Sequence, residues 1–185
     1  MKKWSNDSVI FCKVKEEWGG YSNMSCEYKV RIGNVLINHC EGLYQSLRYP
    51  DRIDIQKEII KEKSPMSSKM KSKKYYRYTR KDWDDVKEDI MYWCLKVKLY
   101  FNWNKFSKLL LESGERNIVE KSRRDRFWGA VDMVGENRLG VLLMKLREEV
   151  KVGSVKKGMF PKCDVDNMIF LGENITNPNK KIISW

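Results

Sequence analysis

The chain has 185 residues, and its 37 Lys and Arg residues against 25 Asp and Glu give a formal net charge of +12 at pH 7. Its length fits one compact domain and is too short for two ordinary enzyme domains, and its 42% hydrophobic and 12% aromatic content excludes a disordered chain. The positive charge favours anionic partners such as phosphate esters, nucleotides or nucleic acid, although a solvated lysine-rich surface fits it equally well.

Histidine and cysteine usage excludes several classes of site. The single histidine, His39, excludes H-E-x-x-H zinc sites and mechanisms that need two imidazoles. The five cysteines form no C-x-x-C pair, so neither a disulfide framework nor a zinc knuckle is expected. No apolar run approaches the ~20 residues of a membrane span, and no signal-peptide core follows the first lysines. We therefore expect a cytoplasmic protein with reduced thiols, no metal and no cofactor.

Short strands and a hairpin are predicted near the N-terminus. Residues 9–12 form an apolar strand, and Gly33-Asn34 separates the apolar runs 28–32 and 35–37 in the manner of a hairpin turn. Asn38 is expected to cap the next helix, with Glu41 as the third residue of a capping box.

Helices dominate the rest of the chain. We expect them over 51–61, from a Ser64-Pro65 start, from a cap at Asp82 along the apolar stripe Trp83 to Phe101, from a cap at Asn104 to Leu111, and over the leucine repeat 139–150, with a short strand at 118–119. Residues 153–185 indicate an extension of strands or a partly ordered tail. The sum is a mostly helical, single-domain α+β fold with a small antiparallel β element near the N-terminus.

Each candidate site residue has a structural alternative. The candidates are the polar residues of loops and helix starts, with two tryptophans: Asn23, Glu41, Gln45, Asp125, Asp132, Asn137, Trp83 and Trp128. Glu41 fits a capping box, Trp83 fits the core stripe, and Asp125 can pair with neighbouring arginines. The stretch 69–81 combines lysines and arginines with three tyrosines and no acid, which suits single-stranded nucleic acid or simple solvation.

Several segments, taken in order, resemble motifs of the NADAR family, the YbiA-like N-glycosidases. They are Gly20-Tyr21-Ser22-Asn23-Met24, Glu41-Gly42-Leu43-Tyr44-Gln45, Ser64-Pro65-Met66 with Lys69-Met70, Arg80-Lys81-Asp82-Trp83, Asp125-Arg126-Phe127-Trp128-Gly129 and Gly135-Glu136-Asn137-Arg138-Leu139-Gly140. The resemblance implies a YbiA-like domain over residues 1–152 and a C-terminal extension over 153–185. The chain departs from the family pattern at Gly42, where the family usually has His.

The resemblance implies hydrolysis of the C–N bond between ribose and a base-like amine, as in phosphorylated ribosylaminopyrimidine intermediates of riboflavin biosynthesis. Such a reaction passes through a ribosyl oxocarbenium-like state that a carboxylate can stabilise. By this resemblance Glu41 is the first choice for the catalytic carboxylate and Asp125 the second, and Trp83 completes the catalytic set. The substrate-binding residues would be Gly20, Tyr21, Ser22, Asn23, Gln45, Lys69, Arg80, Trp128, Gly129 and Asn137.

Two further functions stay open from the sequence. Some relatives remove ADP-ribose from guanine in DNA, so the partner can be a small phosphorylated ribosyl or ADP-ribosyl compound or ADP-ribosylated DNA. The third hypothesis is a non-catalytic nucleotide or nucleic-acid binding module, motivated by the charge of +12 and the basic stretch 69–81.

Overall fold

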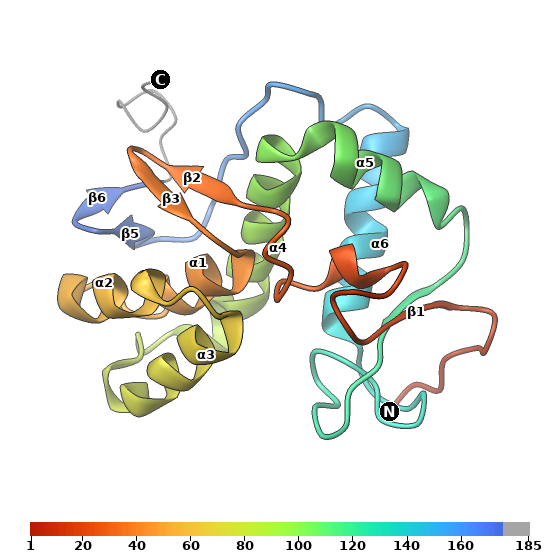
Figure 1. Ribbon diagram of the computed structural model, residues 1–185, viewed down its shortest axis with the longest axis horizontal. Helices are drawn as coiled ribbons and strands as arrows, with labels where there is room; N and C mark the ends of the chain where they lie inside the picture. Colours follow the sequence, from red (N-terminus) through yellow and green to blue (C-terminus); the bar gives the residue numbers. More distant parts are fainter. Residues whose placement is uncertain (176–185) are drawn as a thin grey trace. The chain divides into compact units, whose positions relative to one another are not determined.

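The computed structural model describes residues 1–175, a part of the chain with six α-helices and three two-stranded sheets (Figure 1). The predicted mostly helical α+β class is confirmed. Contacts group the residues into two compact units: Met1–Ser25 with Asn102–Met159, and residues 26–101 with 160–175. Neither unit is a continuous segment, so no single cut divides the chain into two sequence domains. Within the described residues, no helix is both long and apolar enough to cross a membrane.

A parallel pair of short strands anchors the first unit. β1 (Val9–Phe11) lies beside β4 (Ile118–Glu120), with Val9 opposite Ile118 and Phe11 opposite Glu120. Both strands match the expected positions. In β1 the first and third residues are buried and Ile10 is exposed, so the strand turns one face to the core. The pairing joins the first strand of the chain to a segment far along the sequence.

Two helices and a short 3-10 turn complete this unit. They are η1 (Gly19–Tyr21), α5 (Trp103–Glu112) and α6 (Arg138–Lys151). The leucines of α6 are buried as their spacing predicts. The cap predicted at Asn104 is wrong: α5 begins at Trp103, and Asn104 lies inside its first turn, where its Oδ1 accepts a hydrogen bond from Lys157 Nζ at 3.2 Å.

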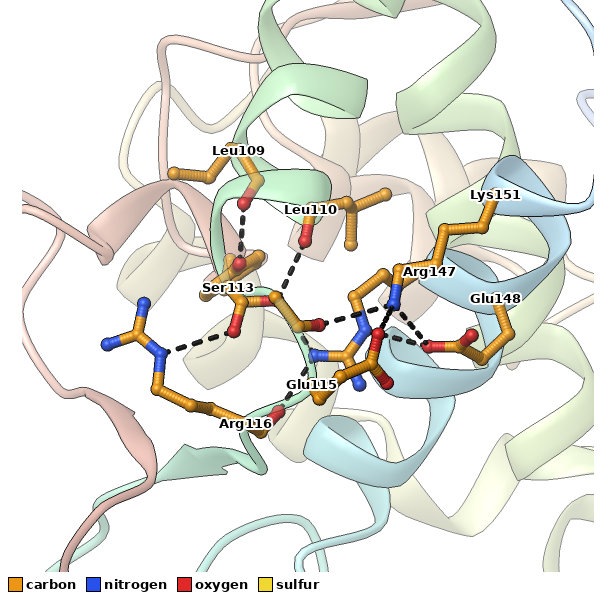
Figure 2. A network of polar contacts seen from close by, with 10 residues as sticks. Leu109, Leu110, Ser113, Glu115, Arg116, Arg147, Glu148 and Lys151 are labelled. Carbon is orange, nitrogen blue, oxygen red and sulfur yellow. Dashed lines mark hydrogen bonds and ion pairs between the residues drawn. The ribbon is translucent and has the colours of Figure 1, made fainter.

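A buried guanidinium fastens α6 to the turn after α5 (Figure 2). Arg147 Nη1 donates to Ser113 Oγ at 2.9 Å and to the Arg116 carbonyl oxygen at 2.7 Å, while its Nε donates to Glu148 Oε1 at 2.9 Å. Lys151 Nζ approaches the same Glu148 carboxylate at 3.4 Å. The buried charge is surrounded by acceptors, which is the condition under which a protein tolerates it.

The second unit begins with the predicted hairpin. β2 (Val30–Ile32) pairs antiparallel with β3 (Val35–Ile37), and the turn between them contains Gly33 at a φ of +55°, which glycine adopts without strain. The elements that follow are α1 (Cys40–Ser46), α2 (Ile53–Lys61), α3 (Pro65–Lys74), the 3-10 turn η2 (Tyr76–Tyr78) and α4 (Trp83–Phe101). α1 packs against α2, α3 and α4. The short helix α1 therefore has three helices of its own unit around it.

The cap of α1 differs from the prediction. His39, not Asn38, precedes the first helical turn, and its Nδ1 accepts the N–H of Gly42 at 2.9 Å. The predicted capping box is wrong because Glu41 stands at the second helical position, where its Oε1 accepts a hydrogen bond from Gln45 Nε2 at 2.9 Å. The Glu41 side chain therefore points along its own helix rather than back to the cap.

The other helices of this unit start close to the predicted positions. Ser64 Oγ accepts the N–H of Ser67 at 3.4 Å and Pro65 opens α3, as predicted. α2 starts at Ile53, slightly later than expected, and α4 starts at Trp83, directly after the predicted cap.

Part of the predicted C-terminal extension lies against the second unit. β5 (Ile169–Phe170) pairs antiparallel with β6 (Glu173–Asn174). Gln56 of α2 holds this pair, since its Nε2 donates to the Ile169 carbonyl oxygen at 2.8 Å and its Oε1 accepts the N–H of Leu171 at 2.6 Å. Residues 176–185 of the predicted extension lie outside the described residues, and the division at residue 152 stays a prediction.

Candidate active site

The turn that leads into α1 is fixed by a neutral histidine. His39 takes an extended conformation (φ −158°, ψ 150°), and its ring accepts the N–H of Gly42 through Nδ1. Nε2 lies 3.3 Å from the carbonyl oxygen of Glu62, so the tautomer with its proton on Nε2 satisfies both contacts. Burial lowers the pKa of His39, which favours this neutral form. The cap positions Glu41, two residues further along the chain.

Gly42 leaves room for the His39 ring. A Cβ at position 42 would lie 3.0 Å from Cε1 and 3.3 Å from Nδ1 of His39. The departure from the family pattern at this position thus has a physical counterpart, because a side chain at position 42 would come into tight contact with the imidazole of His39.

Glu41 is a buried carboxylic acid with few polar neighbours. Burial raises its pKa, while the positive charge of Lys69 on α3 and the hydrogen bond from Gln45 Nε2 lower it. Gln45 lies one turn further along α1 and is also buried. The packing of α1 on α3 thus brings three predicted site residues, Glu41, Gln45 and Lys69, into one electrostatic cluster.

Two aromatic rings and a guanidinium form a further set of contacts in the same unit. The rings of Tyr44 and Trp83 are 5.2 Å apart and inclined at 46°. Arg48 Cζ lies 4.9 Å from the centre of the Trp83 ring, in a cation–π contact. Trp83 is buried, so the structure assigns it to the packed wall between α1 and α4. Tyr44 stands on α1 three residues after Glu41, and Arg48 lies in the turn just after the end of this helix.

The guanidinium of Arg80 is hydrogen-bonded within the protein. Its Nε and Nη2 donate to the two carboxylate oxygens of Asp82 at 2.6 Å and 2.8 Å. Nη2 also donates to the Asp166 carbonyl oxygen at 2.7 Å, and Nη1 to that of Asn167 at 3.4 Å. The guanidinium therefore ties the C-terminal segment to the start of α4. Its predicted contact with substrate phosphate stays a prediction.

The predicted loop of residues 20–23 belongs to the first unit. Tyr21 is buried and its OH donates to the Leu109 carbonyl oxygen at 2.7 Å, which holds the loop, including Gly20, on α5. Burial raises the pKa of Tyr21 to about 12, so the phenol stays a donor. Ser22 Oγ accepts the N–H of the residue two places on at 3.1 Å, and Asn23 between them is buried.

Asp125 uses its carboxylate to fold its own loop. Its Oδ1 accepts the N–H groups of Phe127 and Trp128, each at 2.9 Å. The carbonyl oxygens of Phe127 and Trp128 in turn accept the first N–H groups of α6, and that of Gly129 accepts the N–H of Asn137. The loop thus caps a helix with its main chain. A Cβ at Gly129 would lie 2.7 Å from a main-chain oxygen, so only glycine fits there.

Asn137 fastens the start of α6 to strand β4. It is fully buried with φ at +50°, its Oδ1 accepts the N–H of Glu120 at 2.9 Å, and its Nδ2 donates to the Ile118 carbonyl oxygen at 2.8 Å. Gly140 is required beside it, since a Cβ there would lie 2.0 Å from the same Ile118 oxygen. Both ends of the Asn137 amide are therefore used by the fold.

The predicted residues thus divide between the two units. The second unit contains Glu41, Gln45, Lys69, Arg80 and Trp83, and the first contains Gly20, Tyr21, Ser22, Asn23, Asp125, Trp128, Gly129 and Asn137. Within the described residues, no group of three or more His, Cys, Asp and Glu side chains is placed to hold a metal ion. Sequence reasoning missed Arg48 and the capping role of His39. It also missed Lys98, a fully buried lysine of α4 whose pKa burial lowers to about 8.

A family model described as the NADAR domain matches residues 10–151 of the chain. Over 148 residues the chain is 28% identical to N-glycosidase YbiA of Escherichia coli (strain K12), covering 79% of this chain and 91% of that protein. Over 147 residues it is 30% identical to N-glycosidase Npun_R5314 of Nostoc punctiforme, covering 78% and 93%.

Two further matches concern a longer protein and a solved structure. The chain is 30% identical over 112 residues to the riboflavin biosynthesis protein VVA0006 of Vibrio vulnificus, and the match covers 60% of this chain and 30% of that protein. An NMR structure of the Escherichia coli protein YbiA matches with a TM-score of 0.69 at 25% identity, covering 85% of this chain and 94% of that one. The expected YbiA-like fold is confirmed by this match.

Proposed function

The chain belongs to the NADAR family, and on that premise we propose that it is an N-glycosidase, a hydrolase that cleaves the C–N bond between a ribose and a base-like amine. Two relatives that it matches over most of their length carry the name N-glycosidase. The proposal assigns the reaction to the acid of α1.

The observation that carries the proposal is the buried carboxyl group of Glu41. Burying an ionisable group costs free energy unless the charge is paired. Among the described residues, the hydrogen bond of Glu41 is to Gln45, one turn along the same helix, and no helix cap or strand depends on it. An acid with a raised pKa and no visible structural use is a strong candidate for a functional group.

The chemistry requires one water and one carboxylate. As the C–N bond breaks, positive charge develops on the ribose ring, and the ionised Glu41 carboxylate stabilises it. A water then bonds through its oxygen to the anomeric carbon and gives one proton to Glu41, and Glu41 passes that proton to the departing nitrogen and returns to its ionised form. The raised pKa of Glu41 makes its carboxylate a stronger base than an exposed glutamate.

The neighbours of Glu41 have supporting roles in this proposal. Lys69 favours the ionised form of the acid that the reaction needs. Gln45 orients it by donating to Oε1. The buried ring of Trp83 contacts Tyr44 and Arg48, and its role against the substrate stays a prediction, whereas the guanidinium of Arg48 offers charge for a phosphate. Arg48 serves this purpose better than Arg80, whose guanidinium already has four contacts.

The substrate that we propose first is a phosphorylated ribosylaminopyrimidine of the riboflavin pathway. A relative that the chain matches over part of its length is named for riboflavin biosynthesis. The remaining assignments, Asn23, Asp125, Trp128 and Asn137, stay predictions. The Oδ1 atoms of Asp125 and Asn137 already accept hydrogen bonds from main-chain N–H groups, so any contact of these atoms with substrate would add to those bonds or replace them.

A second candidate substrate, ADP-ribosylated guanine in DNA, is favoured by the surface of α3 and η2. No acid occurs between Glu62 and Asp82, and the side chains of Lys73, Lys74 and Arg77 are exposed. Tyr76 beside them is 72% exposed, which suits stacking on a nucleobase. Such a surface can hold the nucleic acid that carries the modified base.

A panel of ribosylated compounds tests both candidates. The protein is incubated with a ribosylaminouracil phosphate and with an oligonucleotide carrying ADP-ribosylated guanine, and released base is separated by chromatography. Release from the small compound supports the first substrate, and release only from the oligonucleotide favours the second. Base release from neither, with a folded protein, contradicts the proposed function.

A further inference from the structure

A hollow of about 420 Å³ lies in the first unit at the edge where β1 and β4 end. It is lined by residues that follow the two strands: Cys12 and Lys13 after β1, and Lys121, Ser122 and Arg123 after β4. Because the strands are parallel, their carboxyl ends meet at one edge, which is where ligands bind in parallel sheets. The volume is that of a small-molecule site.

The charges of the hollow favour an anion. Lys13, Lys121 and Arg123 contribute three positive charges, and Glu16 contributes one negative charge. Glu16 is partly committed, since its Oε2 accepts the N–H of Lys13 at 3.1 Å and its Oε1 lies 4.0 Å from Lys13 Nζ. Within residues 1–175, Lys121 and Arg123 form no ion pair with a carboxylate. Two cations without counter-charge therefore face the same hollow.

The lining offers both apolar and polar contacts. Ile10 is 36% exposed on the outward face of β1, and Cys12 follows it on the same face, so an apolar wall stands beside the cations. Ser122 Oγ accepts the N–H groups of Arg124 and Asp125, at 3.3 Å and 2.9 Å, which leaves its hydroxyl hydrogen available to donate.

We propose that this hollow binds the phosphate group of a small phosphate-bearing ligand, with Lys121 and Arg123 as its cationic contacts and the Ser122 hydroxyl as a donor. Guanidinium and ammonium groups are the side chains that bind phosphate most readily. The site lies entirely in the first unit and does not depend on the chemistry at Glu41.

The chain contains its own probe for this site. Cys12 lines the hollow, while Cys26, also exposed, belongs to the other unit and provides an internal reference. The full chain is treated with N-ethylmaleimide with and without inorganic pyrophosphate, and alkylation of each cysteine is followed by peptide mass spectrometry. Pyrophosphate at about ten times its Kd is expected to slow Cys12 alkylation roughly tenfold and to leave Cys26 unchanged.

Matched variants separate binding from screening. Lys121→Met and Arg123→Met are expected to lose the protection, whereas Lys156→Met, which removes an exposed cation of the same unit outside the hollow, is expected to keep it. Sodium chloride at equal ionic strength is expected to leave Cys12 reactive. The proposal would be overturned by equal protection of both cysteines, by protection of Cys12 in sodium chloride, or by protection that survives in the double variant Lys121→Met/Arg123→Met. Protection of Cys12 by an oligonucleotide but not by pyrophosphate would overturn it as well.

Discussion

Asp125 in the first unit and Glu41 in the second are both predicted site acids, but their carboxylates bind different partners. Asp125 accepts two main-chain N–H groups and shapes the loop that caps α6. Glu41 accepts a side-chain hydrogen bond from Gln45 and pays the free-energy cost of burial in the core of helices around α1. The carboxylate of Asp125 therefore stabilises the structure of its loop, whereas burial of the Glu41 carboxyl group lowers the stability of the fold.

The same contrast extends to the neighbours of each acid. Asn137 and Gly140, which follow the Asp125 loop, lock α6 onto β4. Gln45 and Lys69, the partners of Glu41, act instead on the position and ionisation of the acid. Substitutions at the first region are therefore expected to change stability, and substitutions at the second to change chemistry.

The largest effect on stability is expected at Gly140. Alanine there would place Cβ 2.0 Å from the Ile118 oxygen and within 2.6 Å of the Asn137 amide, so Gly140→Ala is expected to cost about 3 kcal/mol or more. Gly42→Ala is the matched control, because its Cβ would meet His39 at 3.0 Å and alanine favours the helix by about 1 kcal/mol. Urea unfolding measures the free energy of unfolding of both variants, and equal values for the two would contradict the close packing inferred at Gly140.

Asn137→Ala is expected to destabilise the protein by about 2–4 kcal/mol. The change leaves the N–H of Glu120 and the oxygen of Ile118 without their buried partners. Asn137→Gly loses the same hydrogen bonds, but glycine adopts a φ of +50° without strain. Its free energy of unfolding should therefore be about 1 kcal/mol higher than that of Asn137→Ala. Denaturant midpoints of the pair test this order, and a wild-type midpoint for either variant would refute the structural role.

Glu41→Gln is expected to stabilise the fold at neutral pH. The folded-state pKa of Glu41 is raised, so its contribution to stability is complete below the unfolded pKa and is lost as pH rises through the folded value. Glutamine removes that loss and still accepts from Gln45. A gain of about 1 kcal/mol would raise Tm by roughly 2–4 °C. Tm of both proteins at pH 8 and near pH 4 measures it, and a Tm lower than wild type at pH 8 would count against the assignment.

Lys69→Met is expected to shift the pH dependence of catalysis. Loss of this positive charge raises the pKa of Glu41 further, so the acid limb of the kcat/KM profile should move to higher pH. Lys73→Met, a change on the exposed side of the same helix, should leave the limb in place. Identical profiles for wild type and Lys69→Met would show that Lys69 does not act on the titrating group.

Local signals predicted much of the fold, and non-local contacts account for what they missed. The Gly33-Asn34 turn and the leucine spacing of α6 lie within short segments, so the sequence alone predicts the hairpin and the helix. The pairing of β1 with β4 depends on segments far apart in the chain. The cap of α1 depends on the fit of the His39 ring beside Gly42, which a capping rule for Asn and Glu does not contain.

The candidate site follows the same division. Motif resemblance placed Glu41, Gln45 and Lys69 among the candidates, and α1 and α3 bring them together. The burial of Glu41 arises from helices that pack around α1, so spacing alone predicted a cap instead. The roles of Asp125 and Asn137 in main-chain hydrogen bonding required the loop geometry.

The most direct test of the central claim is the rate of base release by Glu41→Gln on a substrate that the native protein cleaves. Glu58→Gln, a change to an exposed acid of α2, serves as the control. We predict at least about a hundredfold loss for Glu41→Gln with the fold retained, and native turnover for the control. Native turnover by Glu41→Gln would show that this acid is not the catalyst.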